Sequence, residues 1–318
     1  MLKGKNWLQW SVLVVLGVFM LFAGGCGGGG ETVDVPPPPP PNGNWIDVAD
    51  TSWYNETQNN FPIDTPEKLA GLAKLVNGGN NFENKTVYLA KNIDLGGRYW
   101  TPIGNHIYAA SFRGIFDGQG NTISNIAISI EEIIIEETIV EAMIGFVGNN
   151  GGTVTNVRLT DAAISGANDA LVYAGGLVGW NRGTITDCTV IDSYISPSGY
   201  GCVAGGLVGT NGFDEGAGTI TGCEVSNSTI SASDPLSNTV ATAGGLAGQT
   251  GDGGTITDCV VSGGKVTAIS RNGYAYSGGF IGIVESSSSS LSGNTTTERP
   301  AIGRDERLSP PGPSDNIW

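Results

Sequence analysis

Two short motifs that recur together constrain the fold of this chain more than any other feature. The first motif is a pair of apolar residues between glycines, repeated about every 30 to 40 residues. Its copies are Ile144-Gly-Phe-Val-Gly148, Gly175-Gly-Leu-Val-Gly179, Gly205-Gly-Leu-Val-Gly209, Gly244-Gly-Leu-Ala-Gly248 and Gly278-Gly-Phe-Ile-Gly282. The second motif follows each of the first four copies, as Gly152-Thr-Val-Thr, Gly183-Thr-Ile-Thr, Gly218-Thr-Ile-Thr and Gly254-Thr-Ile-Thr. With a looser third segment such as Tyr194-Ile-Ser, the repeat predicts three short β-strands separated by turns.

A repeat of this length cannot bury its own apolar side, so successive copies must stack on one another. In-register stacking of parallel strands gives an all-β chain folded as a right-handed parallel β-helix. Aligning the copies predicts two internal rows of apolar side chains. These rows are Val154, Ile185, Ile220 and Ile256, and Leu159, Val190, Val225 and Val261. The length of the repeat varies in the segments between the motifs and not within the motifs themselves. The insertions are therefore expected in surface loops.

These repeats, which cover residues 112–284, resemble the GLUG-repeat family of bacterial exported proteins. That family includes adhesin-like proteins and some immunoglobulin A peptidases. The resemblance implies the solenoid architecture. The peptidases of that kind carry a separate zinc-protease domain, and no segment of this sequence matches one.

The segments on either side of the repeats differ in composition from them. Residues 45–111 are expected to form an N-terminal cap and the first strands. Thr65-Pro66-Glu67 is typical of a helix start, and the apolar face from Leu69 to Val76 predicts a short capping helix that ends before Gly78. Residues 285–318 are rich in Ser, Thr and Pro, which predicts a disordered tail. Either that tail folds over the last coil or a partner covers the coil.

The N-terminal 25 residues have the pattern of a secretory signal. Lys3 and Lys5 precede an apolar run from Ser11 to Phe22, which ends at Ala23-Gly-Gly-Cys26. This junction resembles the lipobox of bacterial lipoproteins, although Ala23 stands where leucine is usual. The resemblance implies that Cys26 is acylated, so that the chain is exported, lipid-anchored to the membrane of the bacterial cell envelope and surface-exposed. Plain secretory cleavage and an uncleaved anchor helix are the alternatives.

Residues 26–44 form a Gly- and Pro-rich spacer between this anchor and the folded region. Six consecutive prolines, Pro36 to Pro41, favour an extended left-handed helix that spans roughly 19 Å at about 3.1 Å per residue.

The charge and the histidine content restrict the possible chemistry. The chain has 15 basic and 30 acidic residues, a net charge of -15, which disfavours nucleic acid as a partner. It has one histidine, His106, so neither an HExxH site nor a multi-histidine zinc site can be built, and the sequence gives no strong support for a Ser-His-Asp set. We expect His106 to pack in a loop. The sequence predicts no catalytic, cofactor-binding or metal-binding residues.

Three of the five cysteines share one repeat position. Cys188, Cys223 and Cys259 stand where Val157 stands in the preceding copy, which favours a role as small buried core residues. A disulfide between neighbouring coils is allowed by distance, but in-register side chains point in parallel. The absence of a CxxC spacing disfavours a metal site.

Other polar and aromatic segments have two interpretations each. Asp117-Gly-Gln-Gly-Asn121 looks like part of a calcium loop, but a tight turn is favoured because the other acidic ligands are missing. The acidic stretch from Glu131 to Glu141 is interpreted as a solvated excursion, with a partner-binding arm as the alternative. N-terminal aromatic residues either seal the cap or bind sugars, and we favour sealing. They are Trp45, Trp53, Tyr54, Phe61, Tyr99, Trp100 and Tyr108.

Two functional hypotheses follow. The first is a non-catalytic, surface-anchored, adhesin-like binding or structural module whose partner is an extracellular glycan or a host or surface protein. The second is a polysaccharide lyase or hydrolase, because such enzymes also use β-helices. An enzyme of that type needs acids that converge on one face of adjacent coils, whereas the repeats place Asp187, Gly222 and Asp258 at one equivalent position. This pattern favours binding.

Overall fold

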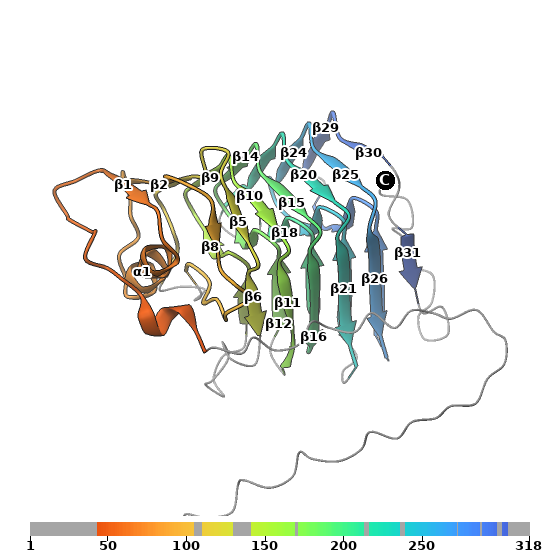
Figure 1. Cartoon of the computed structure of the whole chain (residues 1–318). Coiled ribbons are helices and arrows are strands. Elements are labelled where there is room, and N and C mark those ends of the chain that lie inside the picture. The colour runs from red at the N-terminus through yellow and green to blue at the C-terminus, as the bar shows by residue number, and fades with distance from the viewer. Residues whose placement is uncertain are drawn as a thin grey trace, which may run out of the picture. The chain divides into compact units, whose positions relative to one another are not determined.

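The chain forms an all-parallel β-solenoid, which confirms the predicted fold class (Figure 1). The computed structural model describes residues 43–104, 110–129, 141–168, 171–212, 216–235, 239–271, 273–286 and 288–297, and the backbone of 301–304. Cys26, His106 and residues 130–140 lie outside the described residues. Right-handed winding remains a prediction from the chirality of parallel crossovers. No helix among the described residues is long and apolar enough to span a membrane.

Each complete coil contains five strands, so the predicted count of three is wrong. One coil consists of β9 (Thr153–Thr155), β10 (Arg158–Thr160), β11 (Ala163–Asn168), β12 (Leu171–Gly175) and β13 (Val178–Asn181). The glycine motif does not lie within one strand. It is split between β12 and β13 because Gly176 and Leu177 form a sharp corner between them.

Equivalent strands of successive coils pair into five parallel sheets. The first sheet contains β1 (Asn60–Ile63), β2 (Thr86–Leu89), β4 (Ile115–Asp117), β9, β14 (Thr184–Thr186), β19 (Thr219–Thr221), β24 (Thr255–Thr257) and β29 (Ser290–Ser292). The second sheet contains β3 (Ile93–Asp94), β5 (Thr122–Ser124), β10, β15 (Thr189–Ile191), β20 (Glu224–Ser226), β25 (Val260–Ser262) and β30 (Thr295–Thr297). The third sheet contains β6 (Ala127–Ser129), β11, β16 (Tyr194–Gly199), β21 (Thr229–Asp234), β26 (Lys265–Ser270) and β31 (Ala301–Arg304).

The remaining two sheets hold the halves of the glycine motif. The fourth sheet contains β7 (Glu141–Ile144), β12, β17 (Cys202–Gly205), β22 (Val240–Gly244) and β27 (Tyr274–Gly278). The fifth sheet contains β8 (Val147–Asn150), β13, β18 (Val208–Asn211), β23 (Ala247–Thr250) and β28 (Ile281–Val284).

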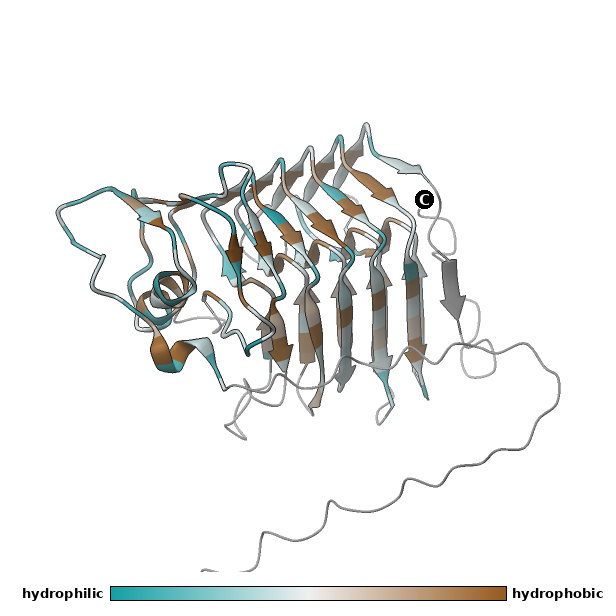
Figure 2. Cartoon of the chain, in the orientation of Figure 1, coloured by the Kyte–Doolittle hydropathy of each residue, from teal (hydrophilic) through white to brown (hydrophobic). Residues whose placement is uncertain are grey.

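The strand register confirms both predicted internal rows. Ile220 pairs with Ile185 on one side and with Ile256 on the other, and Val225 pairs with Val190 and Val261. Both rows are buried and belong to one continuous apolar core. Figure 2 shows hydrophobic bands that recur along successive strands of the solenoid. The backbone ladder therefore fixes which side chains stack.

The N-terminal cap contains the predicted helix. Helix α1 (Pro66–Asn77) begins after Thr65, whose side chain accepts a hydrogen bond from the backbone N–H of Lys68 at 3.2 Å, and it ends at Gly78. Leu69, Leu72 and Val76 bury its apolar face against the first coils. A short 3-10 helix, η1 (Trp45–Val48), was not predicted and also packs in this region.

The ladder continues beyond Val284, so the prediction of a disordered tail is wrong for its first part. Leu291 in β29 pairs with Ile256, and Ile302 in β31 pairs with Val266. The serine- and threonine-rich composition concealed this register, because pairing with the preceding coil depends on backbone hydrogen bonds and needs few apolar residues. Residues 305–318 lie outside the described residues.

Candidate functional site

The acids that share one repeat position form a corner of the backbone and not a catalytic groove. Asp187 has φ 52°, Asp258 has φ 53°, and Gly222 between them has φ 64°. This left-handed conformation is accessible to Gly, Asp and Asn with little strain. Both aspartates are exposed at the junction of the first and second sheets. The turn explains why these residue types recur there, without any catalytic requirement.

A second corner, between the second and third sheets, has the same left-handed backbone conformation. Asp161, Asp192 and Asn227 have φ values of 55°, 50° and 51°, and Gly263 follows with φ 63°. All three side chains are exposed. The aspartates that recur at equivalent positions of the repeats, with their Asn and Gly replacements, therefore lie along two corners.

The cysteine row lies in the core, as predicted. Cys188, Cys223 and Cys259 are at most 1% exposed, and all three thiols are free. Each thiol donates to the carbonyl oxygen two residues earlier, at 3.2, 3.4 and 3.2 Å respectively. Hydrogen bonding with Cys188 raises the pKa of Cys223, and hydrogen bonding with Cys223 raises the pKa of Cys259. The thiols of Cys223 and Cys259 therefore stay protonated at neutral pH and are poor nucleophiles.

The fourth buried thiol, Cys202, lies in β17 and is also free. Burial, followed by the charge of Asp234, raises the pKa of Cys202 to about 12. Cys202, Cys223 and Cys259 therefore offer no thiolate at neutral pH.

A buried asparagine ladder was not predicted from the sequence. The side-chain amide of Asn150 donates to Asn181 at 2.8 Å, and that of Asn181 donates to Asn211 at 2.8 Å. All three side chains are fully buried at the corner between the fifth and first sheets. The signal was an asparagine two residues before the Gly-Thr of the second motif in the first two copies. The ladder satisfies the backbone of this corner and has no access to a substrate.

The glycines of the first motif allow the backbones of the fourth and fifth sheets to come into van der Waals contact. A Cβ atom on Gly205 would lie 1.9 Å from the carbonyl oxygen of Val208, and one on Gly244 would lie 1.8 Å from that of Ala247. The outer faces of the fourth and fifth sheets therefore approach too closely for any larger residue. The repeated glycines are explained by packing.

Further from this corner, the fourth and fifth sheets enclose a separate aromatic cluster. The rings of Tyr173 and Trp180 lie 5.1 Å apart, with Met143 and Val203 beside them. The guanidinium of Arg182 lies 5.6 Å from the centre of the Trp180 ring. Both aromatic rings are buried, so they do not form an exposed sugar platform.

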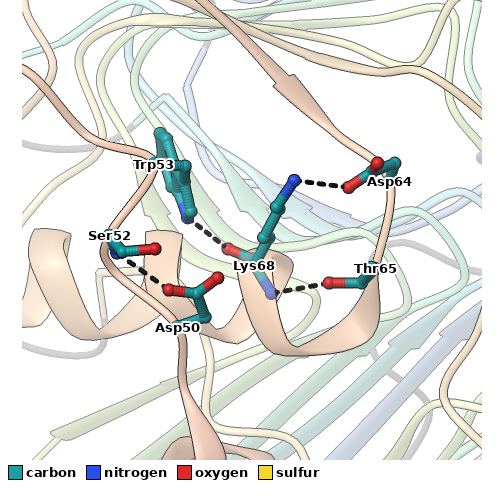
Figure 3. Close-up of polar contacts among 6 residues, drawn as sticks. All are labelled: Asp50, Ser52, Trp53, Asp64, Thr65 and Lys68. Atoms are coloured by element: carbon teal, nitrogen blue, oxygen red, sulfur yellow. Dashed lines mark hydrogen bonds and ion pairs between the residues drawn. The ribbon is translucent and has the colours of Figure 1, made fainter.

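The N-terminal aromatic residues seal the cap, as predicted. Phe61 and Trp100 are buried, and the half-buried Trp53 and Tyr54 pack against the same core. The Trp53 indole N–H donates to the carbonyl oxygen of Lys68 at 3.1 Å (Figure 3). Tyr108 lies outside the described residues.

The same close-up shows the polar contacts that hold the entry to helix α1 (Figure 3). The Lys68 ammonium pairs with Asp64 at 2.8 Å, and the backbone N–H of Ser52 donates to Asp50 at 2.9 Å. These contacts lower the pKa of each carboxyl, chiefly through its hydrogen bonds with Lys68 and Ser52 respectively. Their role is to fix the cap.

Asp117 forms the predicted tight turn. Its carboxylate accepts hydrogen bonds from the Gln119 backbone at 2.8 Å and from the Asn156 amide at 3.2 Å, while the Asn121 amide donates to the carbonyl oxygen of Leu89 at 3.1 Å. Within the described part of the chain, no group of three or more His, Cys, Asp or Glu residues is placed to hold a metal ion.

The outer face of the first sheet carries the most regular side-chain arrangement of the surface. Two threonines flank the inward residue of each strand from β9 to β24, and the strands pair in exact sequence register. One row contains the threonines that begin the strands, Thr153, Thr184, Thr219 and Thr255. The other row contains the threonines that end them, Thr155, Thr186, Thr221 and Thr257. We call these eight residues the threonine face. All eight are partly exposed.

Comparison with known proteins supports the architecture. The sequence matches no protein-family model and no curated protein. The structure is similar to the crystal structure of a candidate immunoglobulin A1 protease from Bacteroides ovatus, with a TM-score of 0.58 and 20% sequence identity. The match covers 81% of this chain and 80% of the other. At this identity the similarity shows a shared fold and leaves the activity of this chain undefined.

Proposed function

We propose that this chain is a non-catalytic, adhesin-like binding module, exported and anchored by a lipid on Cys26 to the bacterial cell envelope. The observation that carries the proposal is that the recurring acids and the recurring threonines lie on different parts of the solenoid. The recurring acids turn the backbone at exposed corners, whereas the threonine face presents many equivalent polar groups on a rigid ladder. Many weak, equivalent contacts give useful affinity when copies are crowded on a cell surface. An extracellular glycan or a surface protein is the partner class.

A β-helix lyase or hydrolase is the rival function. It would need acid and base groups on one face of adjacent coils, within reach of one scissile bond. Asp187 and Asp258 are separated by a coil that carries Gly222, and the four described thiols are buried. The similar Bacteroides ovatus protein adds a protease as a further possibility, but the shared fold alone does not transfer an activity.

The test is an assay of the full chain, solubilised in detergent, against a panel of acidic and neutral polysaccharides and surface proteins. We expect weak binding that strengthens when the chain is displayed in many copies on vesicles, with no reducing ends, unsaturated uronates or peptide fragments released. Asp187→Asn and Asp258→Asn are expected to bind as the wild type does. Product release that disappears in either variant would overturn the proposal in favour of an enzyme.

A further inference from the structure

The ionisable residues of the chain are divided unevenly between the N-terminal cap and the coils. Residues 43–113, which hold the cap and the first strands, contain six basic and seven acidic residues. Residues 114–297 contain four basic and 17 acidic residues. The cap lies at one end of the solenoid, next to β1 and β2, and the last coil lies at the other end (Figure 1). An anionic surface would therefore repel the coils far more strongly than the cap.

The cap also contains a cation that no other described residue neutralises. Among the described residues, the guanidinium of Arg98 has no hydrogen-bond or ion-pair partner, and its Nε atom is buried. A guanidinium has five N–H donors in a planar fork, and a charged donor that is buried without an acceptor is costly. The fork matches two oxygen atoms of a phosphate or a carboxylate. This arrangement leaves Arg98 free to bind an anion from outside the chain.

Trp45 holds this guanidinium in place. The carbon at the centre of the guanidinium lies 5.0 Å from the centre of the Trp45 ring. The indole N–H of Trp45 and the backbone N–H of Arg98 both donate to the carbonyl oxygen of Leu95, at 2.9 and 3.1 Å. The backbone N–H of Trp45 also donates to the carbonyl oxygen of Tyr99 at 2.9 Å. Because the pair is braced before any ligand arrives, binding requires little further ordering of side chains.

The residues around this pair distinguish a lipid headgroup from a soluble anion. Val48, in the same 3-10 helix as Trp45, is 43% exposed. Asp47 lies between these two residues in sequence, but its carboxylate accepts from the backbone N–H of Asn44 at 3.4 Å and forms no ion pair with Arg98. A cation, an aromatic ring and an exposed aliphatic side chain are the groups that proteins place at the level of membrane headgroups. A soluble acidic sugar would use the guanidinium and leave Val48 in water.

We propose that Arg98, braced by Trp45, binds the phosphate of a phospholipid headgroup in the membrane that carries the anchor. This inference rests on the lipid anchor of the proposed function and adds a second contact with the same membrane. Gly43, beside the Arg98 guanidinium, is 17 residues after Cys26, so a lipid on Cys26 keeps it within about 60 Å of the membrane. At the resulting effective concentration a weak contact is sufficient. With the cap on the membrane, repulsion of the acidic coils holds the last coil away from the surface.

The experiment uses the full chain, isolated from membranes with its anchor and reconstituted in vesicles of phosphatidylethanolamine and phosphatidylglycerol, some of whose headgroups carry a nitroxide. A fluorescent label on Ser52→Cys, an exposed position of the cap, reports contact with the headgroups through quenching. We expect strong quenching, which is lost when Arg98→Gln is added and kept when Lys91→Gln is added. Lys91 is the matched control because it is an exposed cation of the same cap. A label on Tyr274→Cys, exposed on β27 of the last coil, should stay unquenched in every variant.

The chain without an added cysteine is the blank for labelling. Its four described thiols are buried, so label that it takes up reports a free Cys26 and refutes the anchor. The unanchored chain is then floated with the same vesicles. Flotation of the wild type that Arg98→Gln abolishes supports the headgroup contact even without the anchor, and equal flotation of the two overturns it.

Equal quenching of the Ser52→Cys label with and without Arg98→Gln, or no quenching in either, would overturn the proposal. Arg98→Lys, which keeps the charge, should restore part of the quenching, whereas an unfolded cap would not respond to it. Binding of a polyuronate that Arg98→Gln abolishes, without quenching in vesicles, would reassign the pair to an acidic glycan. Product release in the polysaccharide assay would refute the non-catalytic function and leave the headgroup contact standing.

Discussion

The side-chain amide of Asn181 donates a 2.8 Å hydrogen bond to the side-chain oxygen of Asn211 in the next coil, and both side chains are fully buried. Asn181 also accepts from Asn150 of the preceding coil, so it links three successive coils. Inside a protein such a chain of hydrogen bonds is stronger than in water, and each member is costly to leave unpaired. The ladder therefore specifies the register of this corner.

Asn181→Ala should lower the free energy of unfolding by about 1 to 3 kcal/mol, because it leaves the Asn150 donor and the Asn211 acceptor without their partners. Urea unfolding followed by circular dichroism measures this change. Ser226→Ala, on the outward side of the second sheet, is the control and should change it by less than about 0.5 kcal/mol. Equal stability of the two variants would show that the ladder contributes nothing.

Ile220→Asp places an unpaired carboxylate in an internal row between Ile185 and Ile256. We expect it to cost several kcal/mol, on the order of 4, and to disrupt the neighbouring coils. Ala217→Asp introduces the same charge at an exposed position before β19 and should leave the melting temperature almost unchanged. Thermal unfolding distinguishes the two, and identical melting curves would contradict the stacking of these strands.

The repeat motifs predicted the solenoid, its internal rows and the capping helix, because each depends on a local pattern of apolar residues and turns. The number of strands per coil was not predictable in the same way. The corner at Gly176 interrupts a motif that reads as one strand, and only the close approach of Gly175 to the backbone carbonyl of Val178 explains it. The strands after Val284 were missed because pairing with an existing ladder stabilises sequences with little apolar content of their own.

The sequence predicted candidate site residues only where the same residue type recurs in successive repeats. Asp187 and Asp258 were correctly placed at one position, but their left-handed φ angles, which identify them as corner residues, depend on how the strands turn. The Thr-Ile-Thr repeats were visible as strands. Their arrangement as a continuous face became apparent only when the register placed Thr186 beside Thr221.

Acylation of Cys26 predicts incorporation of a fatty-acid analogue by cells that express the full chain. Cys26→Ser should abolish labelling, because the spacer that follows holds no other cysteine to carry the acyl group. Cys202→Ser, which changes a buried thiol in β17, is the matched control and should label as the wild type does. Equal labelling of Cys26→Ser and wild type would refute the lipid anchor.

The buried thiol of Cys202 predicts a loss of stability in alkali. Its pKa is raised to about 12 from an ordinary value of 9.0, so the unfolded chain loses this proton at lower pH than the folded chain does. Its contribution to stability is complete below pH 9 and disappears as the pH rises toward 12, with a slope of at most about 1.4 kcal/mol per pH unit. Cys202→Ala should flatten the pH dependence of urea unfolding in this window, and an unchanged slope would contradict the assignment.

The left-handed corner at Asp187 predicts that backbone conformation, and not the carboxylate, decides the effect of substitution. Asp187→Gly and Asp187→Asn should keep wild-type stability and binding, because both residues adopt a φ near 52° with little strain. Asp187→Ala should destabilise the chain by about 1 kcal/mol, the order of the penalty for placing an ordinary side chain in this conformation. Urea unfolding of the three variants in parallel separates the two causes. If Asp187→Asn loses stability or binding as Asp187→Ala does, the carboxylate itself has a role that the corner does not explain.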